Sequence, residues 1–268
     1  MSSLRDIPVA EVDLGPGISA FFTTARGGES SGPYASLNLG SRVGDDPVAV
    51  AANRRAVSDA AGVPLVYGRQ VHSNGVFEVD GPTAQVPDTE IAGDVAASAD
   101  ALVSARYGVG LTVYIADCVP ILFADADAGV IATAHAGRPG LEAGVIAAAV
   151  HEMAAHGATP ASIRAAVGPC ICANCYEVPA DMAQDFATIT RTQVSLTKWG
   201  SVGVDLRAAA ERQLRELGIG KILHISECTY EHAEHGRLFS HRWATHNVER
   251  TNGKSGRFAG VIMRTPAE

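Results

Sequence analysis

Residues 111–155 read LTVYIADCVPILFADADAGVIATAHAGRPGLEAGVIAAAVHEMAA, and this stretch decides the fold. Its short apolar, β-branched runs at 111–116, 121–124 and 130–135 predict strands, and the turn-forming sequence Asp-Ala-Asp-Ala-Gly separates the last two. A glycine-flanked, alanine-rich pattern over 140–155 then predicts a helix. Strands that alternate with helices indicate a mixed α/β domain. Because hairpin-like pairs also occur, we expect helices that cover buried sheets rather than an open, all-parallel sheet.

Outside this stretch the same reasoning predicts further strands and helices. The other strand-like runs lie at residues 18–24, 65–71, 76–79, 101–104, 163–167, 221–225 and 258–263. The other helix patterns lie at 47–61, 179–189 and 206–217, and the last carries Leu206, Ala209, Ala210, Leu214 and Leu217 on one face. No linker or charge block interrupts the chain, so we predict a single domain over residues 1–268.

Composition narrows the classes of partner. With 268 residues, 47% of them hydrophobic, the chain can bury a sizeable core. A net charge of −8 with only three lysines disfavours binding to nucleic acid or an anionic membrane surface. Acidic residues interrupt the most apolar region, and residues 1–6 lack the apolar run of a secretion signal. Five cysteines, an odd number, argue against a disulfide scaffold, so we expect a cytoplasmic protein. A chain of this size can function alone, so we expect a monomer.

Several common catalytic motifs are absent from the sequence or lack the neighbouring elements that they require. Residues 28–32, Gly-Glu-Ser-Ser-Gly, match the nucleophile elbow of serine hydrolases, but Pro33 follows where that motif needs a helix. The sequence has no glycine-rich dinucleotide loop, no phosphate loop and no zinc-deaminase signature. It also lacks the His-x-His pairs of multicopper oxidases, which disfavours a cluster of several copper ions.

Three residues stand at predicted strand ends beside turn-forming residues: His72, Cys118 and His135. Strand ends are where a rigid scaffold presents side chains to a cleft. Two imidazoles and a thiolate are a known ligand set for catalytic zinc, with the fourth position left for water or substrate. The spacing of these residues along the sequence matches no local zinc motif. The competing interpretation is therefore that all three are ordinary, partly buried residues with no ligand role.

A second group of thiols follows Gly168-Pro169. Cys170, Cys172 and Cys175 could bind a structural zinc ion together with Cys228 or His224. The alternative is a reduced, cysteine-rich turn that binds nothing, because no second cysteine pair at zinc-ribbon spacing follows.

At these residues the sequence resembles the laccase-domain purine nucleoside phosphorylases, the YfiH-like proteins also labelled polyphenol oxidases. Motifs in the family's order carry the resemblance across nearly the whole chain. They are Gly32-Pro-Tyr-Ala-Ser-Leu-Asn-Leu-Gly40, Val43-Gly-Asp-Asp-Pro47, Asn53-Arg54, Gln70-Val-His72, Ala99-Asp-Ala-Leu-Val103, Ala116-Asp-Cys-Val-Pro-Ile-Leu122, Ala134-His-Ala-Gly137, Tyr176-Glu-Val178, Cys228-Thr229, Phe239-Ser-His-Arg242 and Ser255-Gly-Arg257. The sequence departs from the family pattern in three places: an arginine displaced by one position, at Arg26; Arg138-Pro139 where the family has Trp-Arg; and Trp243-Ala-Thr-His246 where the family has an Arg-Asp stretch.

The resemblance implies a four-layer α/β/β/α sandwich with mixed sheets and a zinc ion held by His72, Cys118 and His135, with copper as the alternative metal. It also implies phosphorolysis of adenosine, inosine, guanosine and methylthioadenosine, with adenosine deamination as a second activity. The substrates would then be purine nucleosides and phosphate.

The residues themselves suggest further roles at such a site. Asp117 is adjacent to a predicted ligand and is a candidate acid or ligand-orienting carboxylate. Arg26, Arg242 and Arg257 are candidate phosphate ligands, because guanidinium binds phosphate oxygens bidentately, although surface salt bridging is the alternative. Asn38 either binds a sugar hydroxyl or closes the turn that contains it.

Three other functions stay open on the sequence. A Cys-His hydrolase or amidase would use Cys118 as nucleophile and His72 or His135 as base. A copper-dependent phenol oxidase would be redox-active as isolated. A non-enzymatic interaction protein would expose an apolar patch rather than a polar pocket.

Overall fold

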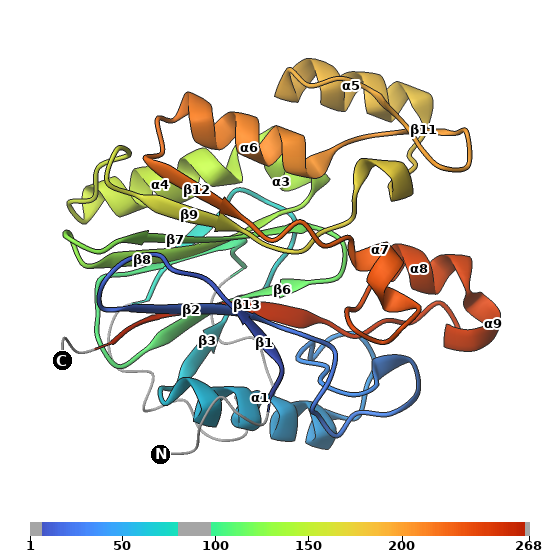
Figure 1. The fold of residues 1–268 in the computed structure, drawn as a ribbon, viewed down its shortest axis with the longest axis horizontal. Helices are drawn as coiled ribbons and strands as arrows, with labels where there is room; N and C mark the ends of the chain where they lie inside the picture. The colour runs from blue at the N-terminus through green and yellow to red at the C-terminus, as the bar shows by residue number, and fades with distance from the viewer. Residues whose placement is uncertain (1–6, 80–97, 266–268) are drawn as a thin grey trace.

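The computed structural model describes residues 7–79 and 98–265, and two β-sheets form its centre (Figure 1). In the first sheet the β3–β6 pair is parallel and the other neighbours are antiparallel. Its strands lie in the order β1 (Val9–Glu11), β2 (Ile18–Thr23), β13 (Phe258–Arg264), β6 (Gly110–Ile115) and β3 (Leu65–Tyr67).

The second sheet contains the hairpin of the central sequence stretch. Its two outer pairs, β12–β9 and β4–β5, are parallel, and the inner pairs are antiparallel. The strand order is β12 (Lys221–His224), β9 (Arg164–Val167), β7 (Val119–Asp125), β8 (Val130–Ala136), β5 (Ala101–Ser104) and β4 (Val76–Glu78). Both sheets are mixed, as the sequence predicts.

Helices cover the outer face of each sheet, which gives four layers (Figure 1). Helix α1 (Pro47–Ala61) lies against the first sheet, and α3 (Arg138–Ala143), α4 (Val145–Ala155) and α6 (Leu206–Glu216) lie against the second. The expected α/β/β/α sandwich is confirmed. The other elements are α5 (Ala180–Thr190), α7 (Thr229–Ala233), α8 (His241–His246), α9 (Val248–Thr251), the 3₁₀ helices η1 (Gly32–Tyr34) and η3 (Ala173–Cys175), and the hairpin β10 (Ser195–Leu196)–β11 (Val202–Gly203).

The apolar core lies in three slabs between these layers. Strand β7 shows why, because side chains alternate between the faces of a strand. Leu122 packs between the two sheets with Phe22, whereas Ile121 and Phe123 pack beneath the helices. All seven residues of β7 are buried, which explains why its sequence is apolar from Val119 to Ala124 instead of alternating.

Two predicted elements differ from the structure. The helix predicted at 140–155 is two helices, α3 and α4, because Gly144 adopts a left-handed conformation (φ +82°) that ends one and begins the next. The strand predicted at 65–71 ends at Tyr67, because the chain turns away to reach His72, which is itself left-handed (φ +63°).

No helix among the described residues is long and apolar enough to cross a membrane. The prediction about a secretion signal falls on residues 1–6, which lie outside the described part of the chain.

Candidate metal centre and active site

The structure brings His72, Cys118 and His135 together from three separate segments. His135 is on β8, Cys118 immediately precedes β7, and His72 lies in the loop after β3. One donor atom from each residue lies within 4.8 Å of the others, and Cys118 Sγ is 3.7 Å from His72 Nε2. The pairing of β7 with β8 accounts for part of this convergence, because Val119 faces Ala136 across the two strands.

This donor set fits a zinc ion. Zn–S and Zn–N bonds of about 2.3 and 2.0 Å at tetrahedral angles place sulfur and nitrogen about 3.5 Å apart. The observed 3.7 Å between Cys118 Sγ and His72 Nε2 is close to that separation. Three protein donors leave the fourth tetrahedral position for a reactant, as in catalytic zinc sites.

Asp100 orients two of the three ligands, and sequence reasoning assigned it no role. Its buried carboxylate accepts a hydrogen bond from His135 Nδ1 (2.8 Å) and one from the backbone N–H of His72 (2.9 Å). It also accepts from the backbone of Val71 and from the backbone and hydroxyl of Ser73. A carboxylate on Nδ1 leaves Nε2 of His135 free to bind a metal, an arrangement common among histidine ligands. Its motif, Ala-Asp-Ala-Leu-Val, was the signal available in the sequence.

The charges in this group form a chain of thiolate, imidazolium and carboxylate, and a metal bound at His135 Nε2 would displace the proton from that nitrogen. Burial would raise the pKa of Cys118, but His135 and His72 lower it to about 6, so the thiolate dominates at neutral pH. Burial opposes the charge on His135, yet Cys118 and Asp100 raise its pKa to about 9. Burial also opposes the charge on Asp100, and hydrogen bonds from His135 and Ser73 lower its pKa to about 2. The thiolate is the form of cysteine that binds metal or acts as a nucleophile.

Gly137 makes room for the ligands. A Cβ atom at this position would lie 2.8 Å from His72 Cδ2 and 2.9 Å from Cys118 Sγ. Both distances are too short for carbon contacts, so any side chain here displaces the imidazole or the sulfur. The His-Ala-Gly sequence therefore supplies one ligand and the space for the other two.

These residues open into a cavity of about 490 Å³. Its lining combines the three candidate metal donors with three arginines and several polar side chains. The lining residues are Gly40, Ser41, Arg42, Val43, Gln70, His72, Tyr114, Ala116, Asp117, Cys118, His135, Tyr176, Leu206, His241, Arg242 and Arg257. Three guanidinium groups beside a three-donor centre suit an anionic reactant.

Two of the arginines predicted to bind phosphate line this cavity. The Arg242 guanidinium lies over the ring of Tyr176, 5.1 Å from its centroid, and donates to the backbone carbonyl of Glu177. Arg257 donates to the carbonyls of Ser255 and Gly256, and burial lowers its pKa. Arg42 adds a guanidinium that the sequence analysis did not single out.

Asn38 lies behind the cavity and does not line it. Its side-chain oxygen accepts from the backbone N–H groups of Gly40 and Arg257, and its nitrogen donates to Asp45. The side chain is fully buried. Asn38 thus fixes the two loops that carry Gly40 and Arg257, which agrees with the turn-closing interpretation.

Asp117 lines the cavity with its carboxylate directed at neighbouring loops. It accepts from the Thr229 hydroxyl and from the backbone N–H of Arg242, both at 2.7 Å. Its backbone is left-handed (φ +102°), and its carbonyl accepts from the N–H of Ile171. This residue therefore ties the segment before Cys118 to the first turn of α8, which bears Arg242.

Arg26 and Arg138 lie outside the cavity lining. The Arg26 guanidinium is exposed and donates to the carbonyls of His235 and Gly236. Arg138 forms a bidentate ion pair with Glu142, one turn further along α3. Arg138 therefore supplies no guanidinium to the cavity in place of the family's arginine.

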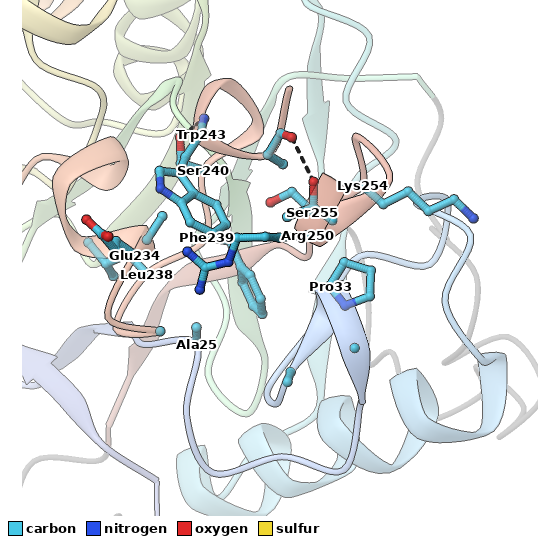
Figure 2. Close-up of a pocket in the computed structure, with 16 residues that line it drawn as sticks. Ala25, Pro33, Glu234, Leu238, Phe239, Ser240, Trp243, Arg250, Lys254 and Ser255 are labelled. Carbon is cyan, nitrogen blue, oxygen red and sulfur yellow. Dashed lines mark hydrogen bonds between the residues drawn. The ribbon is translucent and has the colours of Figure 1, made fainter. Parts of the chain in front are cut away.

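A second cavity, of about 230 Å³, lies between α8, α9 and the loop around Pro33 (Figure 2). Trp243, Arg250 and Lys254 are among the residues that line it. None of the metal-donor groups found among the described residues lies in this cavity. The 490 Å³ cavity therefore holds the candidate active site.

The cysteine group predicted from the sequence has a different membership in the structure. Cys172, Cys175 and Cys228 converge with Glu231. Cys170 points elsewhere, because its sulfur accepts a hydrogen bond from the Arg207 guanidinium on α6, and His224 pairs with Glu211. Cys170 and His224 are thus excluded from this donor group, and Glu231 replaces them.

The fold and this centre define a laccase-like sandwich protein. The family model described as multi-copper polyphenol oxidoreductase laccase matches residues 19–265, and the chain belongs to that family. A purine nucleoside phosphorylase of Streptomyces coelicolor is 43% identical over 244 residues, which cover 90% of this chain and 93% of that protein.

Two further relatives agree in length and fold. A protein named adenosine deaminase RL5, from an unknown prokaryotic organism, is 34% identical over 92% of this chain and 95% of its own. The crystal structure of a Neisseria meningitidis protein superposes with a TM-score of 0.80 at 32% identity, covering 97% of this chain and all of that chain.

Proposed function

We propose that this chain is a zinc-dependent purine nucleoside phosphorylase that cleaves adenosine, inosine, guanosine and methylthioadenosine with phosphate. The observation that carries the proposal is the 490 Å³ cavity, in which a His72–Cys118–His135 donor set faces the same space as Arg242 and Arg257. The name of the Streptomyces coelicolor relative supports the reaction class.

In phosphorolysis a phosphate oxygen forms a bond to the anomeric carbon of ribose while the bond from that carbon to the base nitrogen breaks. The products are ribose 1-phosphate and the free base, which takes up a proton. Positive charge develops on the sugar and negative charge on the base during this step. A site for the reaction must therefore hold a phosphate, orient the sugar and stabilise both charges.

The chain's own residues meet these needs in the proposed arrangement. Arg242 and Arg257, with Arg42 beside them, bind and orient the phosphate oxygens. Asp117 holds the start of α8, which carries Arg242, against the metal-ligand segment, and Asn38 holds Arg257. His72, Cys118 and His135 would hold zinc, which supplies Lewis acidity at that point of the cavity. Arg26 and Asn38 do not line the cavity, so neither is proposed to contact the substrate directly.

Adenosine deamination is the second activity in the proposal, and the relative named adenosine deaminase RL5 favours it. Water would then add at the amino-bearing carbon of adenine, and ammonia would leave. A shared centre predicts that both activities require the same three donors.

The test incubates purified protein with adenosine, with and without phosphate, and separates the products by chromatography. Phosphate-dependent adenine together with ribose 1-phosphate supports the phosphorylase, and phosphate-independent inosine supports the deaminase. Cys118→Ala is expected to abolish both activities, whereas the control Cys170→Ala, a buried cysteine outside the cavity, keeps them. Adenosine that stays intact with added zinc in every condition would exclude adenosine phosphorolysis.

The same cavity contains the elements of a different enzyme. Cys118 with a lowered pKa, His135 and Asp100 form the thiolate, imidazole and carboxylate of a cysteine hydrolase. That function requires no metal, so zinc removal separates the two. Turnover that persists after chelation, together with inactivation by iodoacetamide, would favour the hydrolase. Blue colour or redox activity in copper-loaded protein would favour a phenol oxidase.

A further inference from the structure

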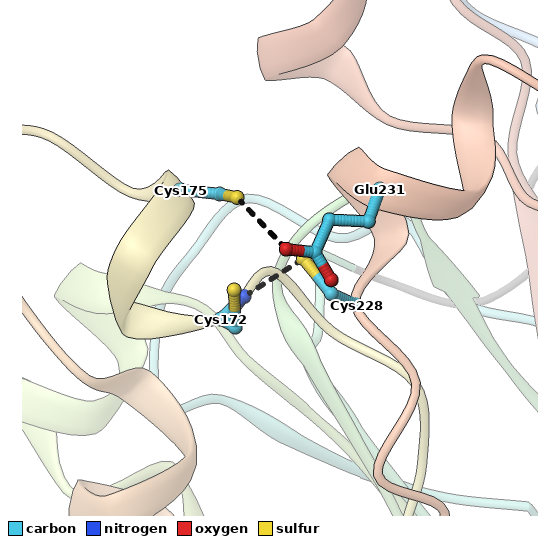
Figure 3. A group of neighbouring side chains, drawn as sticks. All are labelled: Cys172, Cys175, Cys228 and Glu231. Carbon is cyan, nitrogen blue, oxygen red and sulfur yellow. Dashed lines mark hydrogen bonds between the residues drawn. The ribbon is translucent and has the colours of Figure 1, made fainter. Parts of the chain in front are cut away.

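The cysteine group beside η3 has the composition of a closed metal site. Cys172 and Cys175 stand three residues apart, directly before the 3₁₀ turn η3 and at its last residue. Cys228 and Glu231 stand three residues apart at the start of α7 (Figure 3). Pairs with two residues between the donors present both donors on one side of a turn, as in zinc sites built from two Cys-x-x-Cys pairs. Two such turns face each other here.

The donor atoms are already close together. One atom from each of the four residues lies within 4.8 Å of all the others. Cys175 Sγ is 3.8 Å from Glu231 Oε1, and the backbone N–H of Cys172 donates to Cys228 Sγ at 3.3 Å (Figure 3). A tetrahedral ion with Zn–S bonds of about 2.3 Å separates its sulfur ligands by about 3.8 Å, so small side-chain movements complete the geometry.

The surroundings suit a charged thiolate centre. Cys175 and Cys228 are buried, Cys172 is partly buried, and Glu231 closes the group on the solvent side. Three thiolates and a carboxylate around a divalent ion carry excess negative charge. Lys198 interacts electrostatically with both Cys175 and Glu231 and therefore offsets part of that charge.

We propose that Cys172, Cys175, Cys228 and Glu231 bind a structural zinc ion, separate from the ion of the catalytic cavity. Thiolate and carboxylate are both zinc ligands, and four protein donors leave no position for a reactant. This site differs in that respect from the three-donor centre at His72, Cys118 and His135. It takes a metal whether or not the chain is a phosphorylase.

The location gives this ion a structural task. Residue 176, directly after Cys175, is a tyrosine that lines the catalytic cavity, and Thr229, directly after Cys228, donates to the Asp117 carboxylate. An ion that joins η3 to α7 therefore fixes two segments that each reach the active site. Without the ion, Thr229 is held near Asp117 by nearby packing and by one backbone hydrogen bond, from its N–H to the Cys170 carbonyl.

Metal content measured by mass spectrometry tests the proposal on full-length protein purified with reductant from zinc-supplemented cells. Wild-type protein is expected to carry one zinc ion at each site. Cys118→Ala loses only the catalytic ion, and Cys172→Ser loses only the structural one. Cys170→Ser is the matched control, because Cys170 is a buried neighbour outside the group, and it retains both ions.

Two milder variants keep the test informative where Cys172→Ser does not fold. Glu231→Gln is expected to weaken zinc retention against a chelator, whereas Glu234→Gln, an exposed neighbour on the same segment, leaves it unchanged. Cobalt-loaded Cys118→Ala protein should retain strong thiolate-to-cobalt absorption. A single zinc ion in wild-type protein that disappears completely in Cys118→Ala overturns the proposal, and so does a Cys172–Cys228 disulfide in reductant-purified protein.

Discussion

Replacing Asp100 with asparagine keeps the side chain's shape and removes its charge, which isolates the carboxylate's effect on the metal ligands. One oxygen accepts from His135 Nδ1 and the His72 N–H, and the other accepts from the N–H groups of Val71 and Ser73 and from the Ser73 hydroxyl. An amide has only one oxygen, so in either orientation its NH₂ group faces at least two donors. If the NH₂ faces His135, the imidazole must accept at Nδ1 and carry its proton on Nε2, where it no longer binds metal.

Two estimates give the size of the effect. Loss of two charge-assisted hydrogen bonds at about 1.5–3 kcal/mol each lowers the free energy of unfolding by about 3 kcal/mol or more. The pKa of Asp100 gives a similar figure, because a carboxyl held at about 2 rather than its ordinary 3.8 corresponds to about 2–3 kcal/mol in favour of the charged form. Loss of a ligand-orienting partner lowers metal affinity about 10–100-fold.

The assay combines chelator competition for zinc affinity with thermal and denaturant unfolding. The folded chain holds this pKa below its unfolded value, so the stability advantage of wild type over Asp100→Asn is complete above about pH 4 and shrinks as pH falls toward 2. Asp125→Asn is the matched control, because Asp125 is a buried carboxylate at the far end of β7 that accepts from Ala128, Thr159 and Ser162. An Asp100→Asn protein that loses stability as Asp125→Asn does, yet binds zinc with wild-type affinity, would refute the assigned role.

Three other substitutions or conditions test the centre. Gly137→Ala is expected to lower zinc affinity at the catalytic site more than tenfold while the fold is retained, because its Cβ would meet Cys118 Sγ at 2.9 Å; zinc content of the purified variant measures this. Arg242→Gln is expected to raise the KM for phosphate about 10–100-fold, which corresponds to the loss of one charge-assisted hydrogen bond. Initial-rate kinetics measure this, and the control Arg250→Gln, in the second cavity, should leave the KM unchanged. In zinc-free protein, the rate of iodoacetamide labelling of Cys118 should rise with pH through about 6 and then level off, and an increase centred near 9 would contradict the lowered pKa. Peptide mass spectrometry should show that added zinc protects this residue from labelling.

The layers of the fold were predictable because they depend on patterns along the chain. The apolar run of β7 and the largely apolar sequence of β8 indicate strands buried on both faces. The spacing of Leu206 and Leu214 indicates a helix that packs by one side. Short elements such as α7 and η3 escaped prediction, because a few residues carry no periodicity. The break at Gly144 was also missed, since a glycine inside an apolar pattern does not reveal its φ angle.

Residues of the candidate site could be predicted where the residue type itself suggests a role. They could not be predicted where the role depends on contacts between residues far apart in the sequence. Cysteine and histidine at strand ends made His72, Cys118 and His135 candidate ligands, and the structure brings their donor atoms together. Asp100 acts on His135 across 35 residues of sequence, and only the pairing of β5 with β8 brings them together. Glu231 joins the cysteine group across 56 residues from Cys175, and no local spacing indicates that contact.

The ligand segments are held in unfavourable backbone conformations by contacts that need no metal. His72 and Asp117 are both left-handed, which costs a non-glycine residue about 1 kcal/mol or more. The Asp100 carboxylate stabilises the first by accepting from three successive backbone N–H groups around His72. Bonds from Thr229, Arg242 and Ile171 stabilise the second. The segments that carry the three donors are thus positioned by the chain's own hydrogen bonds, and the proposed metal would not be needed to position them.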